Sequence, residues 1–255
     1  MTISAEAPLK VSVISHDQGA WLEGLVADLD ALATPLALTI TLNVPEALPG
    51  SIASRTDIRW RHNDRPQGFG ANHNRAFEQG GGEWFAVLNP DLRLPSDPFP
   101  ALQEAVDAAA VGVVAPRMLA PDGAFDDNAR FFPSPMDLVR KAFGRHEGRV
   151  PITGDAPQAA GWLGGMFLFF PRAVFARLGG FDEGFHLYYE DVDLCARLWK
   201  RGYRVEVVPG ATAVHHAQRA SRRDLRYMGW HLRSIARYFY KHFGRLPEKP
   251  GSQAA

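Results

Sequence analysis

Apolar residues in the first half of the chain change repeatedly between two spacings. Short apolar runs rich in branched side chains predict strands at 11–14, 36–42, 58–61, 84–88 and 111–115. Apolar residues that recur every three or four positions predict helices at 21–32, 71–79 and 99–110. Because strands that alternate with helices pair in parallel, this half predicts an α/β fold with a mostly parallel, doubly wound (Rossmann-like) sheet and helices on both faces.

The second half of the chain is less regular. Turn-forming residues at 122–135 predict a hairpin that prolines interrupt, and residues 144–160 predict a mobile loop. We expect an apolar strand at 161–170, a strand at 203–208, and helices at 171–178, 190–201 and 222–243. Since no internal repeat divides the sequence, residues 1–246 are expected to form one domain and residues 247–255 a disordered tail.

Two polar clusters follow directly after predicted strands. His16 and Asp17 follow the first strand, and Asn89-Pro90-Asp91 follows the fourth. In a doubly wound sheet, ligands bind beyond the carboxyl ends of the strands. The two clusters therefore predict a ligand site at that edge of the sheet.

Composition and charge narrow the function classes. The 28 basic and 28 acidic residues give a formal net charge of zero, so the chain lacks the basic field that gathers nucleic acid, and no nucleic-acid partner is expected. The single cysteine, Cys195, fits a reducing cytoplasm. The first ten residues show no secretory signal, and the most apolar stretch, 162–170, is too short to span a bilayer. We expect a soluble cytoplasmic protein, or one attached peripherally to the inner face of the membrane.

The segment Asn89-Pro90-Asp91 is the first candidate for chemistry. Proline holds Asn89 extended and removes a backbone donor, so the chain turns sharply and presents Asp91 at the end of the strand. One carboxylate together with the phosphate oxygens of a ligand suits Mg²⁺ or Mn²⁺. The alternative is an aspartate that serves only the turn.

Three acids crowd the start of the helix predicted at 190–201. Glu190, Asp191 and Asp193 are favoured there by the exposed backbone amides, so helix capping is one interpretation. Three acids within four residues exceed what a cap requires. The other interpretation is that one of them serves as a general base.

Three further features have both a functional and a structural interpretation. His215 or His216 is either a metal ligand opposite Asp91 or part of a loop after a strand. The turn Gly68-Phe69-Gly70 either brings backbone amides close to an anion or only begins a helix. The pair Gly164-Gly165 either allows close approach of a ligand or forms a bulge.

Taken together, these motifs resemble the family 2 glycosyltransferases, and most closely their rhamnosyltransferase-like branch. The resemblance is carried, in this order, by VSVISHDQGAWL, RPQGFGANHNRAF, FAVLNPDLRL and GWLGGMFLFFPRAVFARLGGFDEGFHLYYEDVDLCARLWKRGYRVEVVPGATAVHH. It covers about residues 10 to 240, and the stretch from Gly161 to His216 is its most specific part.

The resemblance implies a GT-A fold and inverting transfer of a sugar from a nucleoside-diphosphate sugar to an acceptor hydroxyl. It implies that Asp91 and His215 hold a donor Mg²⁺ or Mn²⁺, with His216 as the alternative histidine. Asp191 is implied as the catalytic base, and Glu190 as its neighbour at the acceptor. The other implied contacts surround the nucleotide and the sugars: Ser15, Asp17, Asn43, Phe69, Gly70, Asn89, Gly164 and Gly165.

Two departures from the family pattern refine these expectations. Asn43 stands where the family usually offers an aspartate to the nucleotide, which leaves the preferred base open. No Gln-x-x-Arg-Trp motif of processive members follows His216, so one sugar, with rhamnose as a candidate, is expected to be transferred at each encounter. A saccharide or lipid-linked acceptor is expected, in the synthesis of cell-surface polysaccharide or glycolipid.

Two other functions were weighed against this one. A non-catalytic nucleotide-sugar-binding module would not need the intact Glu190-Asp191 pair. A nucleotidyltransferase would show a glycine-rich basic loop after the first strand, where this chain has 15–19 without lysine or arginine. The predicted last helix, 222–243, mixes arginines with aromatic residues, so it is expected to pack on the domain or to meet an anionic membrane surface.

Overall fold

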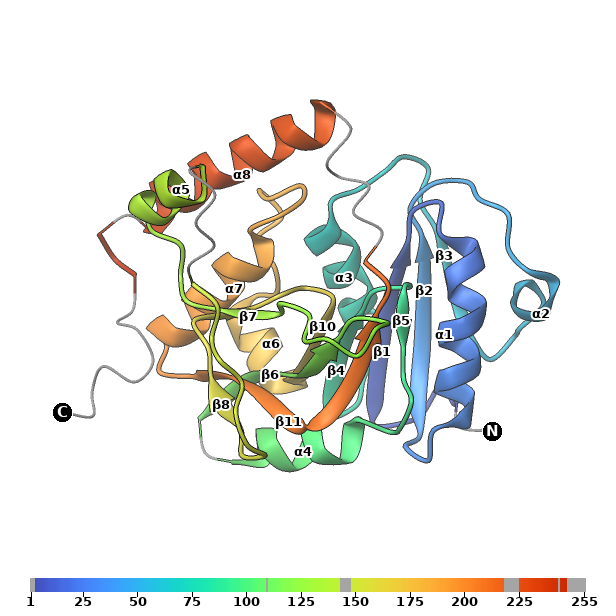
Figure 1. The fold of residues 1–255 in the computed structure, drawn as a ribbon. Helices are drawn as coiled ribbons and strands as arrows, with labels where there is room; N and C mark the ends of the chain where they lie inside the picture. Colours follow the sequence, from blue (N-terminus) through green and yellow to red (C-terminus); the bar gives the residue numbers. More distant parts are fainter. Residues whose placement is uncertain (1–2, 109, 143–147, 218–224, 243, 247–255) are drawn as a thin grey trace.

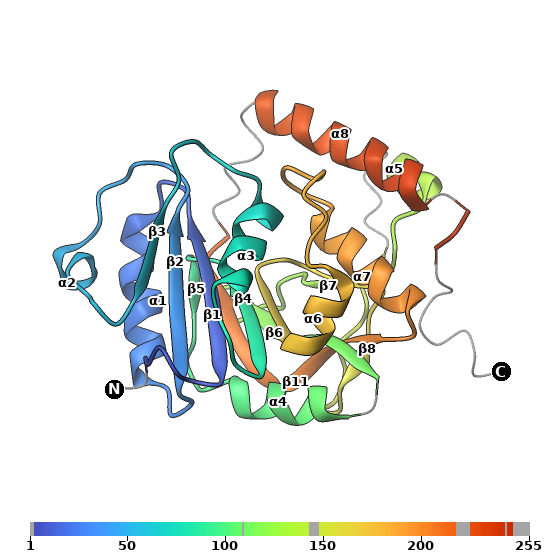
Figure 2. The same ribbon diagram turned by 180° about the vertical axis from the view of Figure 1, so that it is seen from behind.

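The computed structural model describes residues 3–108, 110–142, 148–217, 225–242 and 244–246. A central sheet carries helices on both faces (Figures 1 and 2). Its first part is parallel throughout, in the order β3-β2-β1-β4. These strands are β1 (Leu9–Ser15), β2 (Leu36–Leu42), β3 (Arg59–His62) and β4 (Trp84–Leu88), which confirms the strands predicted for this half.

The other part of the sheet is mixed. β10 (Phe167–Pro171) runs antiparallel to both of its neighbours, β4 and β6 (Val111–Leu119). β6 pairs in parallel with the long β11 (Arg204–His215). Short antiparallel strands, β5 (Leu92–Arg93) and β8 (Gln158–Ala159), complete the sheet along β11. The predicted mostly parallel α/β sheet is confirmed, with one antiparallel strand inserted at its centre.

The helices divide between the two faces of the sheet. One face carries α1 (Gly19–Ala31) and α4 (Phe99–Asp107), while the short α2 (Gly50–Ala53) packs beside α1. The opposite face, which Figure 2 turns toward the viewer, carries α3 (Phe69–Glu78), α6 (Arg172–Leu178) and α7 (Glu190–Lys200). Each face has its own buried apolar cluster.

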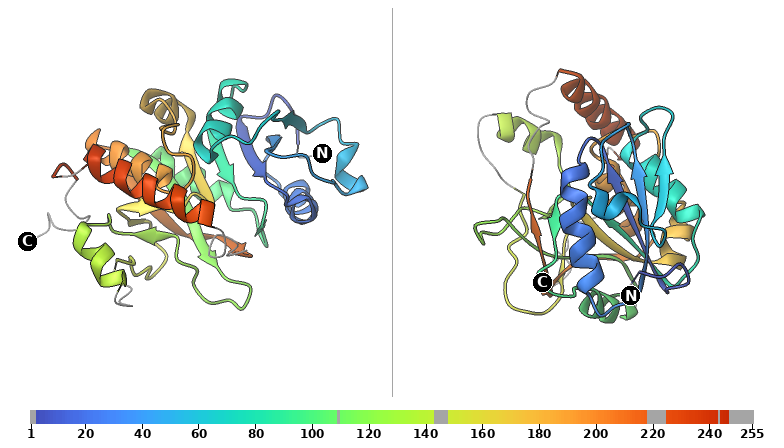
Figure 3. Two further views of the ribbon diagram at one scale, coloured as in Figure 1. Left: turned by 90° about the horizontal axis from the view of Figure 1, so that it is seen from above. Right: turned by 90° about the vertical axis from the view of Figure 1, so that its right-hand side faces the viewer.

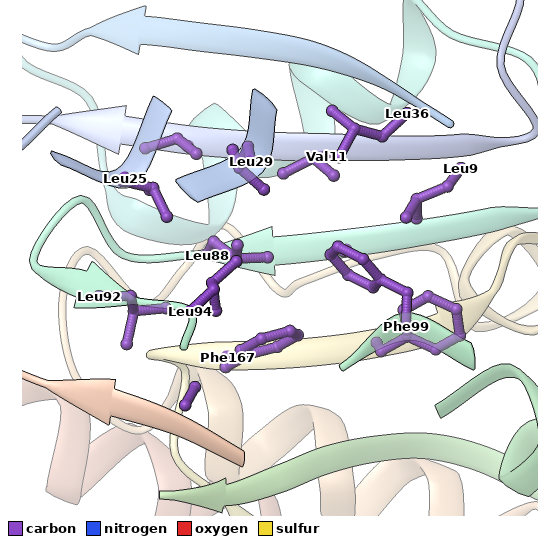
Figure 4. Packing of buried hydrophobic residues seen from close by; sticks show 14 of the residues in the cluster. Leu9, Val11, Leu25, Leu29, Leu36, Leu88, Leu92, Leu94, Phe99 and Phe167 are labelled. Atoms are coloured by element: carbon purple, nitrogen blue, oxygen red, sulfur yellow. The ribbon is translucent and has the colours of Figure 1, made fainter. Parts of the chain in front are cut away.

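The cluster under α1 and α4 shows why the sheet forms at these residues. Val11 of β1 points toward Leu29 of α1, and Phe99 of α4 lies near Phe167 of β10 (Figure 4). The rings of Phe99 and Phe167 lie 6.0 Å apart between centroids, and both side chains are fully buried. Burying a side chain of this size stabilises the fold by about 1.5–3 kcal/mol relative to leaving it exposed.

The single strand predicted at 161–170 is wrong. The segment forms β9 (Trp162–Leu163), which pairs with β7 (Ala129–Arg130) in a separate small sheet, and then β10 in the main sheet. Between them, the N–H of Gly164 donates to the carbonyl of Asn128 at 2.8 Å, and the N–H of Gly165 donates to the carboxylate of Asp191 at 3.0 Å. Gly164 thus continues the register of β7 and β9, and the chain leaves that ladder at Gly165, whose N–H bonds a side chain.

The strand predicted at 203–208 continues further than Pro209-Gly210 suggested. β11 pairs with β6 up to Val208, departs from the ladder over three residues, and resumes pairing at Thr212. A proline and a glycine can be accommodated in a bulge, where a ladder hydrogen bond is already missing. The extension carries β11 to His215, at the ligand edge of the sheet.

The predictions for 122–135 and 144–160 need correction as well. Residues 122–135 do not pair with each other as a hairpin, because Ala129–Arg130 pair with β9. Pro135 begins α5 (Pro135–Ala142), since proline is tolerated in a first turn, and Ser134 and Asp137 cap each other's backbone N–H groups. Residues 158–159 form β8, whereas 144–147 lie outside the described residues.

The last helix, α8 (Leu225–His242), lies across the top of the molecule above α7 (Figures 1 and 3). Ser234, Tyr238 and His242 form its buried face. The fully buried Asp193 of α7 ties the two helices together through His242 and Lys241, each at 2.7 Å. The predicted packing of this helix is therefore confirmed for α8, while 222–224, 243 and the predicted tail at 247–255 lie outside the described residues.

Candidate active site

A cavity of about 1410 Å³ opens at the carboxyl ends of β1 and β4, below α8. Its volume exceeds the roughly 300–1,000 Å³ of ordinary small-ligand pockets, which leaves room for two substrates. Of the site residues predicted from sequence, ten line this cavity: Asp17, Asn43, Phe69, Asn89, Asp91, Gly164, Gly165, Glu190, Asp191 and His215. Ser15 and Gly70 lie behind its wall.

Asp91 and His215 meet on one side of the cavity. Asp91 sits in the turn between β4 and β5, and β5 pairs with the end of β11, so the sheet itself brings the two residues together. Nε2 of His215 lies 3.5 Å from Oδ1 of Asp91, and Nδ1 lies 2.8 Å from Oδ2 of Asp126. Burial alone would lower the pKa of His215, but the neighbouring carboxylates of Asp126 and Asp91 raise that pKa to about 9.

His216 occupies a different position from His215. Its ring lies against Trp21, with 5.2 Å between centroids, and its backbone N–H donates to the carbonyl of Asp91 at 2.9 Å. Only the ring of His215 approaches the Asp91 carboxylate. Of the two histidines left open by the sequence, the geometry therefore favours His215 as the partner of Asp91.

The Asp91 carboxylate has the features of a ligand for a hard cation. Its Oδ1 atom is buried and accepts no hydrogen bond in the described structure, and the residue is only 4% exposed. Among the described residues, no three His, Cys, Asp or Glu side chains converge on one point. A cation here would thus take two protein ligands and complete its shell with water and phosphate oxygens, an arrangement usual for Mg²⁺.

Glu190 and Asp191 lie on another wall of the cavity, at the start of α7. The two preceding residues, Tyr188 and Tyr189, adopt φ values of 66° and 65°, in the left-handed region that tyrosine rarely enters. The ring contacts of both tyrosines with His231, at 5.1 Å and 5.7 Å, help to hold this strained backbone. The strain allows α7 to begin with both carboxyl groups turned toward the cavity.

The carboxyl groups of Glu190 and Asp191 have few hydrogen bonds and no ion pair in the described structure. Oδ2 of Asp191 accepts the Gly165 N–H at 3.0 Å and Oδ1 accepts the Val192 N–H at 2.8 Å, while Oε2 of Glu190 is buried without a hydrogen bond. Burial raises the pKa of Asp191 to about 6, because its backbone hydrogen bonds offset desolvation only in part. Burial and the neighbouring charge of Asp191 also raise the pKa of Glu190 well above its usual range. The pair can therefore hold and exchange a proton near neutral pH.

Asp193, two residues further along the same helix, is compensated by cations. It is fully buried and bonds Arg197, Lys241 and His242. Burial alone would raise its pKa, but the hydrogen bond to His242 and the neighbouring charges hold that pKa below its usual range. Of the three acids noted in the sequence, Asp193 thus has a structural role, and the other two face the cavity.

Asn43 organises the wall nearest the end of β2. Its Oδ1 accepts hydrogen bonds from Asn63, Asn72 and the backbone N–H of Gln67, and its Nδ2 donates to the carbonyl of Gln67 at 3.1 Å. The amide is also 3.1 Å from Nδ1 of His16. Because its polar atoms are engaged within the protein, Asn43 shapes the 63–67 loop; its predicted contact with the nucleotide stays a prediction.

Ser15 and Asp17 lie where β1 ends. The hydroxyl of Ser15 donates to Glu46 at 2.7 Å, and Glu46 also accepts the N–H of Gln18 at 2.9 Å. Ser15 therefore supports the turn from behind. Asp17 adopts a φ of 60° and lies exposed at the cavity.

The glycine positions of the predicted site are sterically constrained. A Cβ at Gly70 would meet Cβ of Phe181 at 2.6 Å, so this glycine permits close packing of α3, and its predicted place near the nucleotide stays a prediction. A Cβ at Gly165 would lie 3.3 Å from the ring of Phe69 and 3.7 Å from Oδ2 of Asp191. Gly165 thus lets the backbone approach the Asp191 carboxylate.

Sequence reasoning missed several residues that contribute to this site. Asp126, in the loop after β6, holds His215, and Glu46 holds the turn after β1. Arg130, Trp230 and His231 also line the cavity. No local pattern distinguishes these residues, because their contacts join distant parts of the chain: Asp126 and His215 are 89 residues apart.

Residues 41–230 of the chain match the family described as Glycosyltransferase like family 2. Over 244 residues the chain is 30% identical to the N-acetylglucosaminyl-diphospho-decaprenol L-rhamnosyltransferase of Mycobacterium tuberculosis (strain ATCC 25618 / H37Rv), covering 85% of this chain and 78% of that protein. It is 29% identical over 242 residues to Rhamnosyltransferase WbbL of Escherichia coli (strain K12), covering 89% of this chain and 91% of that protein.

The fold has a counterpart among solved structures. GalNAc-T7 with UDP, GalNAc and Mn²⁺ superposes with a TM-score of 0.63 at 13% identity, covering 83% of this chain and 44% of that one, so this chain spans less than half of it. The architecture is the GT-A fold that the sequence motifs implied. Together with the match over most of its length, this fold establishes that the chain belongs to glycosyltransferase family 2.

Proposed function

We propose that this protein is an inverting glycosyltransferase that transfers a single sugar, with rhamnose as the first candidate, from a nucleoside-diphosphate sugar to an acceptor hydroxyl. The observation that carries the proposal is the pairing of two unlike acidic sites in one cavity. Asp91 lies beside His215, whereas Glu190 and Asp191 are partly or fully buried without a cationic partner in the described structure. Family membership and the rhamnosyltransferase relatives support the same reaction.

Asp191 is the proposed base. Its carboxylate takes the proton of the acceptor hydroxyl as that oxygen attacks the anomeric carbon of the donor and the bond to the diphosphate breaks. The Gly165 N–H at 3.0 Å and the Val192 N–H at 2.8 Å fix the carboxylate in place. A pKa of about 6 suits a base at neutral pH, because the group is largely ionised yet still basic. Glu190, beside it, is proposed to bind the acceptor.

Asp91 and His215 are proposed to hold Mg²⁺ or Mn²⁺, with water and the donor diphosphate as the other ligands. The buried Oδ1 of Asp91, which accepts no hydrogen bond, supports this assignment. When bound, the ion would act as a Lewis acid that offsets the charge on the departing diphosphate. Asp17, Asn89 and Phe69 line the same cavity and are proposed to contact the donor.

The proposed acceptor is a lipid-linked saccharide in polysaccharide or glycolipid synthesis. The name of the Mycobacterium tuberculosis relative, which includes diphospho-decaprenol, supports a lipid-linked class. The outer side of α8 also exposes Met228, Leu232 and Tyr240 at 55%, 59% and 92%, spaced four and eight residues apart. Among the described residues no helix is long and apolar enough to cross a membrane. We therefore propose peripheral contact of α8 with the membrane, and lack of sedimentation with anionic vesicles would exclude it.

The reaction is tested by release of nucleoside diphosphate from a panel of dTDP-, UDP- and GDP-sugars with Mn²⁺, Mg²⁺ or EDTA. We expect metal-dependent release from one donor. Asp91→Ala is expected to weaken metal-dependent donor binding at least about tenfold, or 1.4 kcal/mol, because it removes the only carboxylate proposed as a ligand. Metal dependence equal to that of the wild type would remove Asp91 from the site.

The same panel separates the alternative functions. Metal-dependent binding of a nucleotide without release, even with saccharide acceptors added, would favour a binding module. Release of pyrophosphate from nucleoside triphosphate and sugar phosphate would favour a nucleotidyltransferase. Limited proteolysis tests the related proposal that residues 1–246 form one domain, since a stable shorter fragment would contradict it.

A further inference from the structure

A carboxylate outside the predicted set contacts His215 on the side opposite Asp91. Oδ2 of Asp126 lies 2.8 Å from Nδ1 of His215, and Nε2 of the same ring lies 3.5 Å from Oδ1 of Asp91. The imidazole therefore bridges two carboxylates, one at each nitrogen. Only the nitrogen that faces Asp91 is directed toward the proposed metal position.

The loop after β6 holds the Asp126 carboxylate in place. The backbone N–H of Asp126 donates to the carbonyl of Met118 at 3.0 Å, and its Oδ1 accepts the N–H of Asp127 at 2.9 Å. The buried Asn128 then anchors the loop on β6, because its side chain donates to the carbonyl of Pro116 at 3.0 Å. Asp126 thus presents Oδ2 to His215 from a framework that does not depend on the metal.

We propose that Asp126 is a positioning residue for the donor metal. Its carboxylate accepts the Nδ1 proton of His215, which fixes the orientation of the ring so that an ion displacing the Nε2 proton would meet that nitrogen beside Asp91. Histidine ligands of metals commonly donate their other N–H to a carboxylate in this way, and loss of that partner typically weakens metal affinity by about 10- to 100-fold. The inference rests on the proposed function, because it assumes that the ion binds between Asp91 and His215.

The competing explanation is that Asp126, His215 and Asp91 form only a structural ion-pair chain that closes one side of the cavity. The two explanations make different predictions about metal binding. In a structural chain, removing Asp126 would lower the stability of the fold and leave the affinity of the folded protein for Mn²⁺ unchanged. A positioning residue instead controls that affinity through His215.

The experiment measures Mn²⁺ affinity by the electron paramagnetic resonance signal of free Mn²⁺, at a saturating concentration of whichever of UDP, dTDP or GDP the wild type binds. Asp126→Asn is the conservative variant, since an amide can still accept the N–H of Asp127. We expect its Mn²⁺ affinity to fall by about 10- to 100-fold. Asp122→Asn is the matched control, because Asp122 lies in the same loop and, among the described residues, its carboxylate accepts only the nearby N–H of Ala124.

Two further readouts show whether Asp126 acts through His215. The double variant Asp126→Asn/His215→Ala is expected to bind Mn²⁺ no more weakly than His215→Ala alone, because residues that act as a unit are not additive. Nitrogen-15 NMR of the wild type with Mg²⁺ and nucleotide is expected to show a protonated Nδ1 on His215. Thermal unfolding of every variant confirms that each is folded at the temperature of measurement.

Three results would overturn the proposal. Wild-type Mn²⁺ affinity in Asp126→Asn would exclude a positioning role while leaving the glycosyltransferase reaction intact. Additive losses in the double variant would mean that Asp126 acts independently of His215. Absence of Mn²⁺ binding in the wild type, alongside donor turnover in EDTA, would instead remove the metal from the proposed function and Asp126 with it.

Discussion

The two acidic walls of the cavity show how one fold gives carboxylates opposite properties. On the β4–β11 wall, Asp91 lies beside a histidine that a second carboxylate holds. On the α7 wall, Glu190 and Asp191 meet backbone amides and each other, but no cationic side chain in the described structure. A buried carboxylate without a cationic partner holds its proton more tightly than one in water. The difference supports the proposal that one wall binds the ion and the other transfers the proton.

The largest expected effect tests the proton-transfer wall. Asp191→Asn keeps the size of the side chain and can keep one of its two backbone hydrogen bonds but removes the base, so turnover is expected to fall by about 10²- to 10⁴-fold. Nucleotide affinity, measured by calorimetry, is expected to remain within a factor of two or so of the wild type. A parallel loss of nucleotide affinity would mean that Asp191 holds the site together instead of acting on the acceptor.

The second prediction compares the stability effects of two acids at the start of α7, Asp193 and Asp191. Asp193→Asn breaks a fully buried ion-pair network, and removing one partner of a buried pair typically costs about 3–5 kcal/mol of unfolding free energy. Urea denaturation of this variant and of Asp191→Asn gives the comparison, because Asp191→Asn removes an uncompensated charge and is expected to leave stability unchanged or raise it. Equal losses of unfolding free energy in both variants would contradict the assignment of a structural role to Asp193 and of a catalytic role to Asp191.

The pH profile is the third test. Because the pKa of Asp191 is raised to about 6, the base is protonated below that pH, and kcat/KM is expected to fall tenfold per pH unit there. Since the folded pKa lies above the ordinary value, the folded state binds this proton more tightly, so its contribution to stability grows as pH falls from above 6 toward 4. Circular dichroism at each pH controls for unfolding, and a flat profile between pH 5 and 8 would rule out this assignment.

The smallest expected effect concerns the glycine beside Asp191. In Gly165→Ala, the new methyl group would lie 3.3 Å from the ring of Phe69, so the unfolding free energy is expected to fall by about 1 kcal/mol and kcat/KM by a few-fold. Gly50→Ala is the matched control, because a Cβ there meets no atom within 4 Å. An unchanged kcat/KM in Gly165→Ala would show that the Asp191 carboxylate tolerates movement of this backbone.

The sequence predicted those parts of the fold and the site that local patterns specify. The parallel strands β1 to β4 follow from the spacing of apolar residues. Asp91, Glu190 and Asp191 stand out because a turn or a helix start requires fewer acidic residues than the sequence places there. The break between β9 and β10, the antiparallel direction of β10 and the continuation of β11 escaped prediction, since they depend on pairing with strands far away in sequence. Asp126 escaped for the same reason, because an aspartate in a turn-rich loop acquires its role only when His215 reaches it.

The three residues over which β11 leaves the β6 ladder determine which residues at the end of β11 face the cavity. Neighbouring residues on a strand point to opposite faces, so the number of residues in this bulge decides which of two adjacent histidines faces Asp91. Deleting one residue from 209–211 would slide the rest of β11 by one position, so that His216 would take the place of His215 and His215 that of Val214. A change in chain length at a distance from the cavity would then decide which of the two histidines meets Asp91 and Asp126.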